Sequence, residues 1–332
     1  MDLIVATENG LYCPPGDFYI DPWRPVARAL ITHGHGDHAR SGSDLYICQR
    51  DSAPILRKRL GEGLTIETVG YGETLSRDGV DVSFHPAGHV LGSAQIRVEY
   101  RGEVWVASGD YKLEADGVSK PFEPVRCDVF ITESTFALPT YRWRAQAEAM
   151  AEIDRWRRDN MSAGRASVIY AYALGKAQRL LANVDAELGP IFCHGAVEAI
   201  NELHRAAGVA LPPTRIITGE ESKAEFAHAL IVAPPSAAGG AWLKRFGDYS
   251  DALASGWMQV RGNRRRRGLD RGFVISDHAD WPGLLSAIEA TGARRVLATH
   301  GFTAPLSRYL SERGLAAQPW GTAYGEDEEA EA

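Results

Sequence analysis

The sequence contains few cysteines and no long apolar run, and both absences narrow the class of protein. Only four of the 332 residues are cysteines, at positions 13, 48, 127 and 193, and none forms a CxxC pair. This spacing argues against a disulfide framework or a cysteine-based zinc site and fits a reducing cytosol. No apolar stretch approaches the roughly 18 residues of a membrane-spanning helix, and the N-terminus, MDLIVATENG, lacks the cationic start of a signal peptide. We therefore expect a cytoplasmic protein that makes no use of a membrane.

The charge is unevenly distributed along the chain. The net charge is −7, and the last seven residues, 326–332, contain five acidic side chains and no basic one. Such a block is typical of a disordered, solvated tail. Residues 261–271 contain six arginines and one aspartate. This basic cluster is either a solvated loop or a path for the phosphates of a nucleic acid.

The length and the pattern of apolar residues predict two structural parts. At roughly 100–200 residues per domain, 332 residues suggest two domains, or one domain with an insertion. The first 140 residues contain short strand-like runs separated by turn residues. Residues 141–270 alternate strand-like and helical segments, which predicts a compact α/β unit with a parallel sheet. This unit includes helices expected at 142–160, 175–188 and 196–207, and a further strand–helix–strand pattern follows residue 271.

Three of the ten histidines lie in one hexapeptide, His33-Gly-His-Gly-Asp-His38, directly after an apolar run that ends at Thr32. The hexapeptide is therefore expected on a loop that leaves a strand. Imidazole nitrogens and a carboxylate are ligands that borderline divalent metals prefer, and the glycines allow the backbone to bend so that the side chains converge. One such loop can serve two ions about 3.5–4 Å apart. A polar surface turn is the alternative, which the density of the HxHxDH pattern disfavours.

Other candidate ligands lie where predicted strands end. His89 is in a glycine-flanked loop, Asp110 follows a strand-like run, and His278 and His300 each follow another. A single histidine in such a position is more often structural, so the prediction rests on the whole set. The remaining histidines lack this context and are interpreted as structural or exposed: His85, His194, His204 and His228.

The order and approximate spacing of these residues resemble the metallo-β-lactamase superfamily. Asp21, the hexapeptide, His89 and Asp110 match its first four motifs, and the later candidates look like three motifs of its β-CASP nucleases: Glu133, His278 and His300. That group includes Artemis-like DNA nucleases, RNase J-like enzymes and the pre-mRNA cleavage endonuclease. Three longer stretches look most similar to bacterial ligase-associated DNA exonucleases, a branch also similar to mRNA 3′-end-processing factors: residues 10–26, 172–180 and 262–281.

The resemblance implies a particular α/β fold. A metallo-β-lactamase αββα sandwich would be formed by residues 1–140 and 271–325. An α/β β-CASP cap domain would be inserted at residues 141–270. The acidic tail, 326–332, would lie outside both.

The resemblance also implies a role for each candidate residue. One divalent ion would be bound by His33, His35, His89 and Asp110, and a second by Asp37, His38, Asp110 and His300. Zinc suits this nitrogen and oxygen set, with manganese as the alternative. Asp21 would hold a ligand imidazole in the right tautomer. Catalysis would depend on Asp37 and on His278, a general acid oriented by Glu133. Nucleic-acid contacts are expected from Lys176, whose alternative is a solvated helix residue, and from Arg264, Arg265, Arg266 and Arg267.

These assignments predict a metal-dependent phosphodiesterase that acts as a DNA exonuclease in repair, through a metal-activated water. Its substrate would be single-stranded DNA or DNA with free ends, and a DNA ligase and a helicase would be its partners. An RNA-processing β-CASP ribonuclease is the alternative, because Artemis-like DNA enzymes usually lack the histidine found here at position 300. A nucleic-acid-binding module without catalysis is disfavoured, because every expected ligand is present.

Overall fold

The computed structural model describes residues 2–260 and 268–321, and these residues divide into two compact units. Unit 1 contains residues 2–115, 119–142 and 278–321, so it is assembled from both ends of the chain. Unit 2 contains residues 116–118, 143–260 and 268–277. No helix within these described ranges is both long and apolar enough to cross a membrane.

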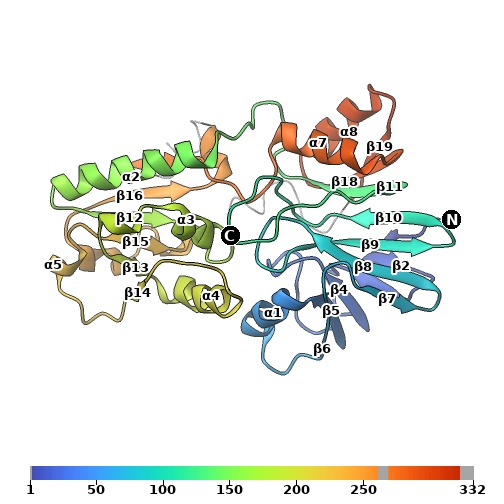
Figure 1. Cartoon of the computed structure of the whole chain (residues 1–332), viewed down its shortest axis with the longest axis horizontal. Helices are drawn as coiled ribbons and strands as arrows, with labels where there is room; N and C mark the ends of the chain where they lie inside the picture. The colour runs from blue at the N-terminus through green and yellow to red at the C-terminus, as the bar shows by residue number, and fades with distance from the viewer. Residues whose placement is uncertain (1, 261–267, 322–332) are drawn as a thin grey trace. The chain divides into compact units, whose positions relative to one another are not determined.

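Two mixed β-sheets form the centre of unit 1 (Figure 1). The first sheet has its strands in chain order: β1 (Val5–Thr7), β2 (Gly10–Cys13), β3 (Phe18–Ile20), β4 (Arg28–Ile31), β5 (Leu45–Gln49) and β6 (Ile66–Val69). The second sheet has the order β19-β18-β11-β10-β9-β8-β7, made of β7 (Thr74–Arg77), β8 (Val80–Pro86), β9 (Ala94–Tyr100), β10 (Glu103–Ala107), β11 (Val129–Ser134), β18 (Arg295–Gly301) and β19 (Ala316–Pro319).

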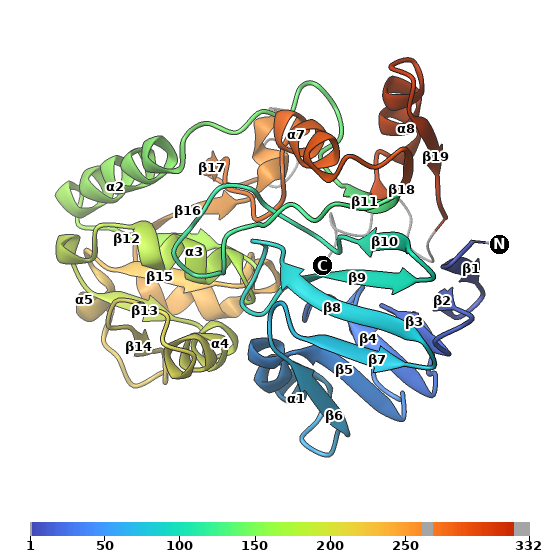
Figure 2. The same ribbon diagram turned by 45° about the vertical axis from the view of Figure 1, so that its right-hand side comes forward.

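The alternation of side chains along the strands gives unit 1 four layers. Leu30 of β4 packs in the core shared by the two sheets, whereas its neighbours Ala29 and Ile31 face the helix α1 (Ala53–Leu60), which follows the short 3-10 helix η1 (Arg50–Ser52). On β11, Ile131 lies in the shared core and Phe130 faces the helices α7 (Trp281–Thr291) and α8 (Thr303–Ser311). Successive strand residues point to opposite faces, so each sheet packs on the other sheet through one face and on helices through the opposite face (Figures 1 and 2).

Local sequence signals determine where α7 begins and ends. The Asp280 side chain accepts a hydrogen bond from the Gly283 N–H at 2.9 Å, and Pro282 occupies the first turn. Gly292 closes the helix in the left-handed conformation, with φ of 66°. These are standard capping signals. The helix start therefore lies directly after the Ser-Asp-His-Ala-Asp segment that contains His278.

Unit 2 is built on an all-parallel six-stranded sheet. Its order is β14-β13-β15-β12-β16-β17, made of β12 (Ala166–Tyr170), β13 (Ile191–Cys193), β14 (Arg215–Ile216), β15 (Leu230–Ala233), β16 (Tyr249–Ala254) and β17 (Arg271–Phe273). One face packs against α2 (Gln146–Ser162), α3 (Lys176–Asn183) and α4 (Gly195–Ala206). The other face packs against α5 (Lys223–Phe226), η4 (Ala241–Phe246) and η5 (Gly256–Gln259).

The predicted helix at 175–188 is shorter in the structure. Helix α3 ends at Asn183, Val184 is extended, and a separate 3-10 helix, η2 (Ala186–Leu188), follows; a further one, η3 (Pro235–Ala237), follows β15. The Asp185 side chain caps η2 by accepting a hydrogen bond from the Glu187 N–H at 3.0 Å. The break therefore has a local cause in the capping aspartate.

Candidate metal centre

Asp21 holds the start of the histidine-rich hexapeptide. It follows β3, whose parallel neighbour β4 leads into the hexapeptide, so the carboxyl ends of two strands meet at one sheet edge. The Asp21 carboxylate accepts hydrogen bonds from the Thr32 N–H at 2.8 Å and from its hydroxyl at 2.5 Å. It also lies 2.7 Å from His38 Nδ1. Asp21 therefore orients the His38 ring through Nδ1 and leaves Nε2 for a different ligand.

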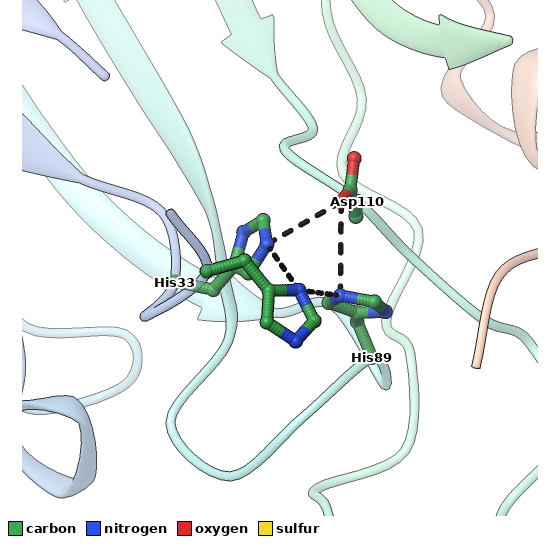
Figure 3. Close-up of side chains that lie close together, drawn as sticks. His33, His89 and Asp110 are labelled. Atoms are coloured by element: carbon green, nitrogen blue, oxygen red, sulfur yellow. Dashed lines mark hydrogen bonds and ion pairs between the residues drawn. The ribbon is translucent and has the colours of Figure 1, made fainter. Parts of the chain in front are cut away.

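Four side chains converge in a first group made of His33, His35, His89 and Asp110, whose ligand atoms all lie within 4.8 Å of one another. His35 Nδ1 is 3.1 Å from His33 Nε2 and 3.0 Å from His89 Nε2. Asp110 Oδ2 is 3.3 Å from His33 Nε2 and 3.7 Å from His89 Nε2. Figure 3 shows His33, His89 and Asp110 pointing toward one another. Three imidazole nitrogens and a carboxylate oxygen around one point are a donor set for a divalent ion.

Glycines bring two of these ligands into place. His89 follows β8 and is preceded by Gly88, with φ of +75°; Asp110 follows β10 and is preceded by Gly109, with φ of +55°. A Cβ on Gly109 would lie 2.6 Å from the Thr32 Cβ, and one on Gly88 would overlap the Lys112 carbonyl oxygen. Any other residue would force the loops apart at these points.

A second group lies beside the first and consists of Asp37, His38 and His300. His38 Nε2 is 3.6 Å from Asp37 Oδ2 and 3.4 Å from Asp110 Oδ2. The His38 ring stacks on the His300 ring with centroids 4.9 Å apart. A pocket of unit 1 is lined by residues of this second group. Asp110 therefore adjoins both groups, at one carboxylate oxygen.

His300 reaches the second group from the end of β18. Its backbone is in the left-handed region, with φ of 49°. The Ser134 hydroxyl donates to the carbonyl oxygens of Thr299, at 2.9 Å, and of His300 itself. Because β11 and β18 are parallel neighbours, the end of one strand fixes the unusual backbone at the end of the other.

His278 and Glu133 form a buried pair next to the first group. His278 Nδ1 lies 2.9 Å from Glu133 Oε2, and the other carboxylate oxygen accepts a hydrogen bond from the Tyr111 N–H at 2.7 Å. Both side chains are buried. Ligand atoms of Glu133, His278 and Asp110 also lie within 4.8 Å of one another. Glu133 thereby holds the ring of His278 through Nδ1, as a proton donor or a metal ligand would require.

Burial and neighbouring charges shift the pKa values of the site residues in different directions. Burial, together with the charge on His38, holds the pKa of His33 well below its usual range. Burial also acts to lower the pKa of His38, but Asp110, Asp37 and Asp21 outweigh it and hold that pKa well above its usual range. Burial acts to raise the pKa of Asp110, but His38 and His33 hold it well below its usual range. The site therefore favours a positive charge at His38 Nε2, whether a proton or a metal ion supplies it.

A further observation supports a divalent ion at the second group. His38 Nε2 is buried and makes no hydrogen bond within residues 2–260 and 268–321, although Asp110 Oδ2 and Asp37 Oδ2 lie 3.4 and 3.6 Å away. Buried nitrogens are nearly always paired in native structures. An ion held by the second group would give this nitrogen a partner, and the nitrogen and oxygen donors are those that zinc accepts. The structure thus contains buried histidine and aspartate clusters that could hold metal; the number and identity of the ions stay predictions.

Of the residues predicted to contact nucleic acid, the structure describes only Lys176. Lys176, at the start of α3 in unit 2, is buried, and its Nζ lies 3.1 Å from Asp277 Oδ1 and 4.3 Å from the centre of the Tyr172 ring. Its predicted phosphate contact stays a prediction. The four arginines at 264–267 and the acidic tail lie outside the described residues.

Sequence reasoning missed the residues that hold the ligands in place. Thr32 donates to Asp21, and its hydroxyl lies 3.1 Å from His33 Nδ1. Ser134 and the Tyr111 backbone act in the same way on His300 and Glu133. Thr32 and Ser134 are each adjacent in sequence to a candidate residue, and this adjacency is the only signal that could have indicated them.

Comparisons with known proteins place the chain among long curated relatives. No family model matches it. A protein of Opitutus terrae named "Probable DNA ligase" is 30% identical over 331 residues, which are 98% of this chain and 32% of that protein. "Endoribonuclease YSH1" of Eremothecium gossypii is 33% identical, and that of Saccharomyces cerevisiae 32% identical, each over 122 residues. In both cases the aligned residues are 36% of this chain; they are 16% of the Eremothecium gossypii protein and 15% of the Saccharomyces cerevisiae protein. The chain thus spans about a third of the length of the ligase-named relative.

A structural comparison supports the fold alone. A crystal structure of a protein of unknown function from Enterococcus faecalis V583 superimposes with a TM-score of 0.50 at 13% identity, over 82% of this chain and 74% of that one. The architecture is thus α/β with several sheets. The sequence relatives support, at modest identity, the resemblance to the metallo-β-lactamase superfamily.

Proposed function

We propose that this chain is a metal-dependent nuclease of the β-CASP group that hydrolyses phosphodiester bonds of DNA. The observation that carries the proposal is the position of Asp110, with one oxygen near both ligand groups and the His278–Glu133 pair beside it. A carboxylate shared between two cation sites about 3.5–4 Å apart is the arrangement that two-metal hydrolysis of phosphodiesters uses.

The two units support a division into catalytic domain and cap. In this proposal the four-layered unit 1 is the metallo-β-lactamase sandwich, and the three-layered unit 2 is the inserted β-CASP cap. The sequence suggests boundaries at 140/141 and 270/271, and the units change at 142/143 and 277/278. The boundary at 277/278 lies directly before His278, so this catalytic candidate is the first residue of the C-terminal segment of unit 1.

The residues of unit 1 would divide the work of hydrolysis between them. Two bound divalent ions, zinc or manganese, would lower the pKa of water toward about 7 and neutralise phosphate oxygens. The chain holds the donors for such ions in His33, His35, His89, Asp110, Asp37, His38 and His300. Asp21 fixes the His38 tautomer. His278 is held at Nδ1 by Glu133, and its Nε2 would deliver a proton to the leaving oxygen.

The relatives support two nucleic-acid substrates unequally. The ligase-named relative matches 98% of the chain and favours DNA. From the family resemblance, we propose a DNA ligase and a helicase of a repair system as partners. The endoribonucleases match only 36% of the chain. They and His300 favour RNA processing, which is the second candidate function. We propose exonuclease action on single strands or free ends, with Lys176 and Arg264–Arg267 contacting phosphates.

The test is degradation of end-labelled single-stranded DNA, duplex DNA and RNA of matched sequence, with sizing of the products. We expect cleavage of DNA by the zinc- or manganese-loaded protein, and no cleavage after chelation. D110A should abolish cleavage while retaining binding of DNA, because the shared carboxylate is lost and unit 2 is untouched.

The matched control is D44A, which removes an exposed carboxylate of the same unit and should cleave as the unaltered protein does. Faster cleavage of RNA than of DNA would favour the second candidate. Full turnover by D110A with both ions still bound would overturn the two-ion assignment.

A further inference from the structure

Helix α1 ends in three consecutive cations, Arg57, Lys58 and Arg59. Its apolar face, with Ala53 and Leu56, packs on the first sheet of unit 1. The cations therefore belong to the last turn, just before Gly61 ends the helix. One of the three, Arg59, reaches the hexapeptide: its Nη1 donates a short hydrogen bond to the Gly34 carbonyl oxygen.

The Arg59 guanidinium lies against the loop between two metal-ligand candidates. A Cβ built on Gly36 would be 3.2 Å from Arg59 Nη2, so glycine at this position leaves the room that the guanidinium occupies. Partial burial lowers the pKa of Arg59, and the negative charge of Asp37 opposes that decrease. The guanidinium is thus a fixed positive charge beside the second ligand group.

Most of the hydrogen-bonding capacity of Arg59 remains unused. The side chain is solvent-accessible. The contact with Gly34 uses one N–H, and a guanidinium has five. Within the described part of the chain, Arg59 makes no other hydrogen bond and no ion pair. A side chain that served only to hold the loop would need no more than this single bond. The remaining donors form a rigid fork suited to a phosphate.

The negative charge of the surrounding carboxylates favours a cation at this point. Asp21, Asp37, Asp110 and Glu133 all belong to the site, so a nucleic-acid strand brings its phosphates toward a set of carboxylates. Bound ions would offset this repulsion most strongly at the cleaved phosphate, because the Coulomb energy falls with distance. A fixed cation on the rim of the loop would do the same for a neighbouring phosphate.

We propose that Arg59 is a substrate-binding residue that contacts a backbone phosphate next to the cleaved one, with its guanidinium positioned by the Gly34 carbonyl. The inference rests on the proposed nuclease function and adds to it a specific cation of unit 1. It also implies that the contact is to the backbone and is therefore independent of base sequence.

The experiment compares R59A, R59K and K58A as metal-loaded proteins. Lys58 is the matched control, because it is an exposed cation of the same turn with no contact to the loop. The probe is a fluorescent single-stranded oligonucleotide with hydrolysis-resistant phosphorothioate linkages, titrated at several salt concentrations. Metal content and hydrolysis of a small activated phosphodiester are measured in parallel.

We expect R59A to weaken binding about 10- to 100-fold, as the loss of a charge-assisted hydrogen bond does. The slope of log K against log salt should fall by about 0.7, one single-strand phosphate contact. R59K should restore the slope but only part of the affinity, because lysine lacks the planar fork. K58A should bind within about twofold of the unaltered protein. The activity loss of R59A should be at least ten times larger on a cleavable single-stranded DNA of the same sequence than on the small diester.

Two results would overturn the inference. One is R59A binding the oligonucleotide as K58A does. The other is R59A losing metal and losing the same fraction of its activity on both cleavable substrates. The second would make Arg59 a support of the metal loop. Failure of the unaltered, loaded protein to cleave any nucleic acid would instead overturn the proposed function, and the difference in binding between R59A and K58A would still decide the role of Arg59.

Discussion

His278 differs from the other site histidines in what holds it. Its Nδ1 faces a carboxylate that is itself anchored by a backbone N–H, whereas His33 and His89 face the nitrogen of His35. Burial raises the pKa of Glu133, although His278 acts against the increase. We expect H278A to retain the metal content and to slow DNA cleavage by about 10²- to 10⁴-fold, the usual loss when a general acid is removed. Single-turnover cleavage and elemental analysis measure the two quantities.

The control for this variant is H85A, a histidine of the same unit outside the ligand groups, which should cleave normally. E133Q should reproduce part of the H278A defect, since it keeps the shape of the side chain and loses its charge. Loss of one metal equivalent in H278A would make His278 a ligand and would remove it from the role of proton donor.

At the scale of elements, the start of β14 is tied to α4 by one carboxylate. Glu198 accepts hydrogen bonds from Arg205 at 2.7 Å, Thr214 at 2.7 Å and Asn201 at 2.9 Å. Burial acts to raise the pKa of Glu198, but these bonds outweigh it and lower the pKa. A lowered pKa stabilises the fold above the unfolded value of about 4.3, and the contribution is lost as the pH falls through the folded value.

We therefore expect E198Q to lose about 1–2 kcal/mol of unfolding free energy at pH 7. The difference from the unaltered protein should shrink as the pH falls below about 4. Urea midpoints at a series of pH values measure it. E202Q, an exposed glutamate of the same helix, should show no such dependence. A difference between E198Q and the unaltered protein that stays constant with pH would contradict the assignment of charge to this network.

The end of α3 shows how contacts between elements change a local pattern. The sequence over 175–188 favours one helix, and Asp185 as a capping residue is only one of the reasons for the break. The Asp185 N–H donates to the Asp154 carboxylate at 3.1 Å, and the Asp185 carbonyl oxygen accepts a bond from the buried Arg157 at 2.7 Å. Both partners lie on α2. The helix ends where it does because a neighbouring helix supplies bonds that a continuous α3 could not make.

At the scale of the whole molecule, bound ions should contribute to stability. The two ligand groups place three histidines or aspartates on each side of Asp110, all of them buried or half-buried. Such polar groups are costly to bury without a counter-charge. Ions that bind the folded chain, at a free concentration 100 to 1,000 times their Kd, stabilise it by about 3–4 kcal/mol. We expect chelation to lower the Tm by about 5–15 °C, and added zinc to restore it. Differential scanning calorimetry measures the change.

D110A provides the comparison, because its Tm should respond much less to the chelator. An equal Tm before and after a removal verified by elemental analysis would contradict the proposed ion sites. An equal response of D110A and the unaltered protein would show that ions act elsewhere in the molecule.

The sequence by itself determined the local features of this protein. The helix predicted at 196–207 is α4 (Gly195–Ala206) in the structure. The hexapeptide concentrates ligand types within six residues that chain connectivity keeps together. Short-range patterns and capping residues of this kind act without the rest of the fold.

Only the tertiary structure decided which distant residues meet. His35 and His89 come within 3.0 Å because β4 and β8 end at the same region of two packed sheets, and neither periodicity nor spacing specifies that pairing. The same holds for the burial of Lys176 beside Asp277 and for the reach of Arg59 to Gly34. Such contacts depend on sheet order and on the packing of whole elements, and these are set by the free energy of the entire core rather than by the residues involved.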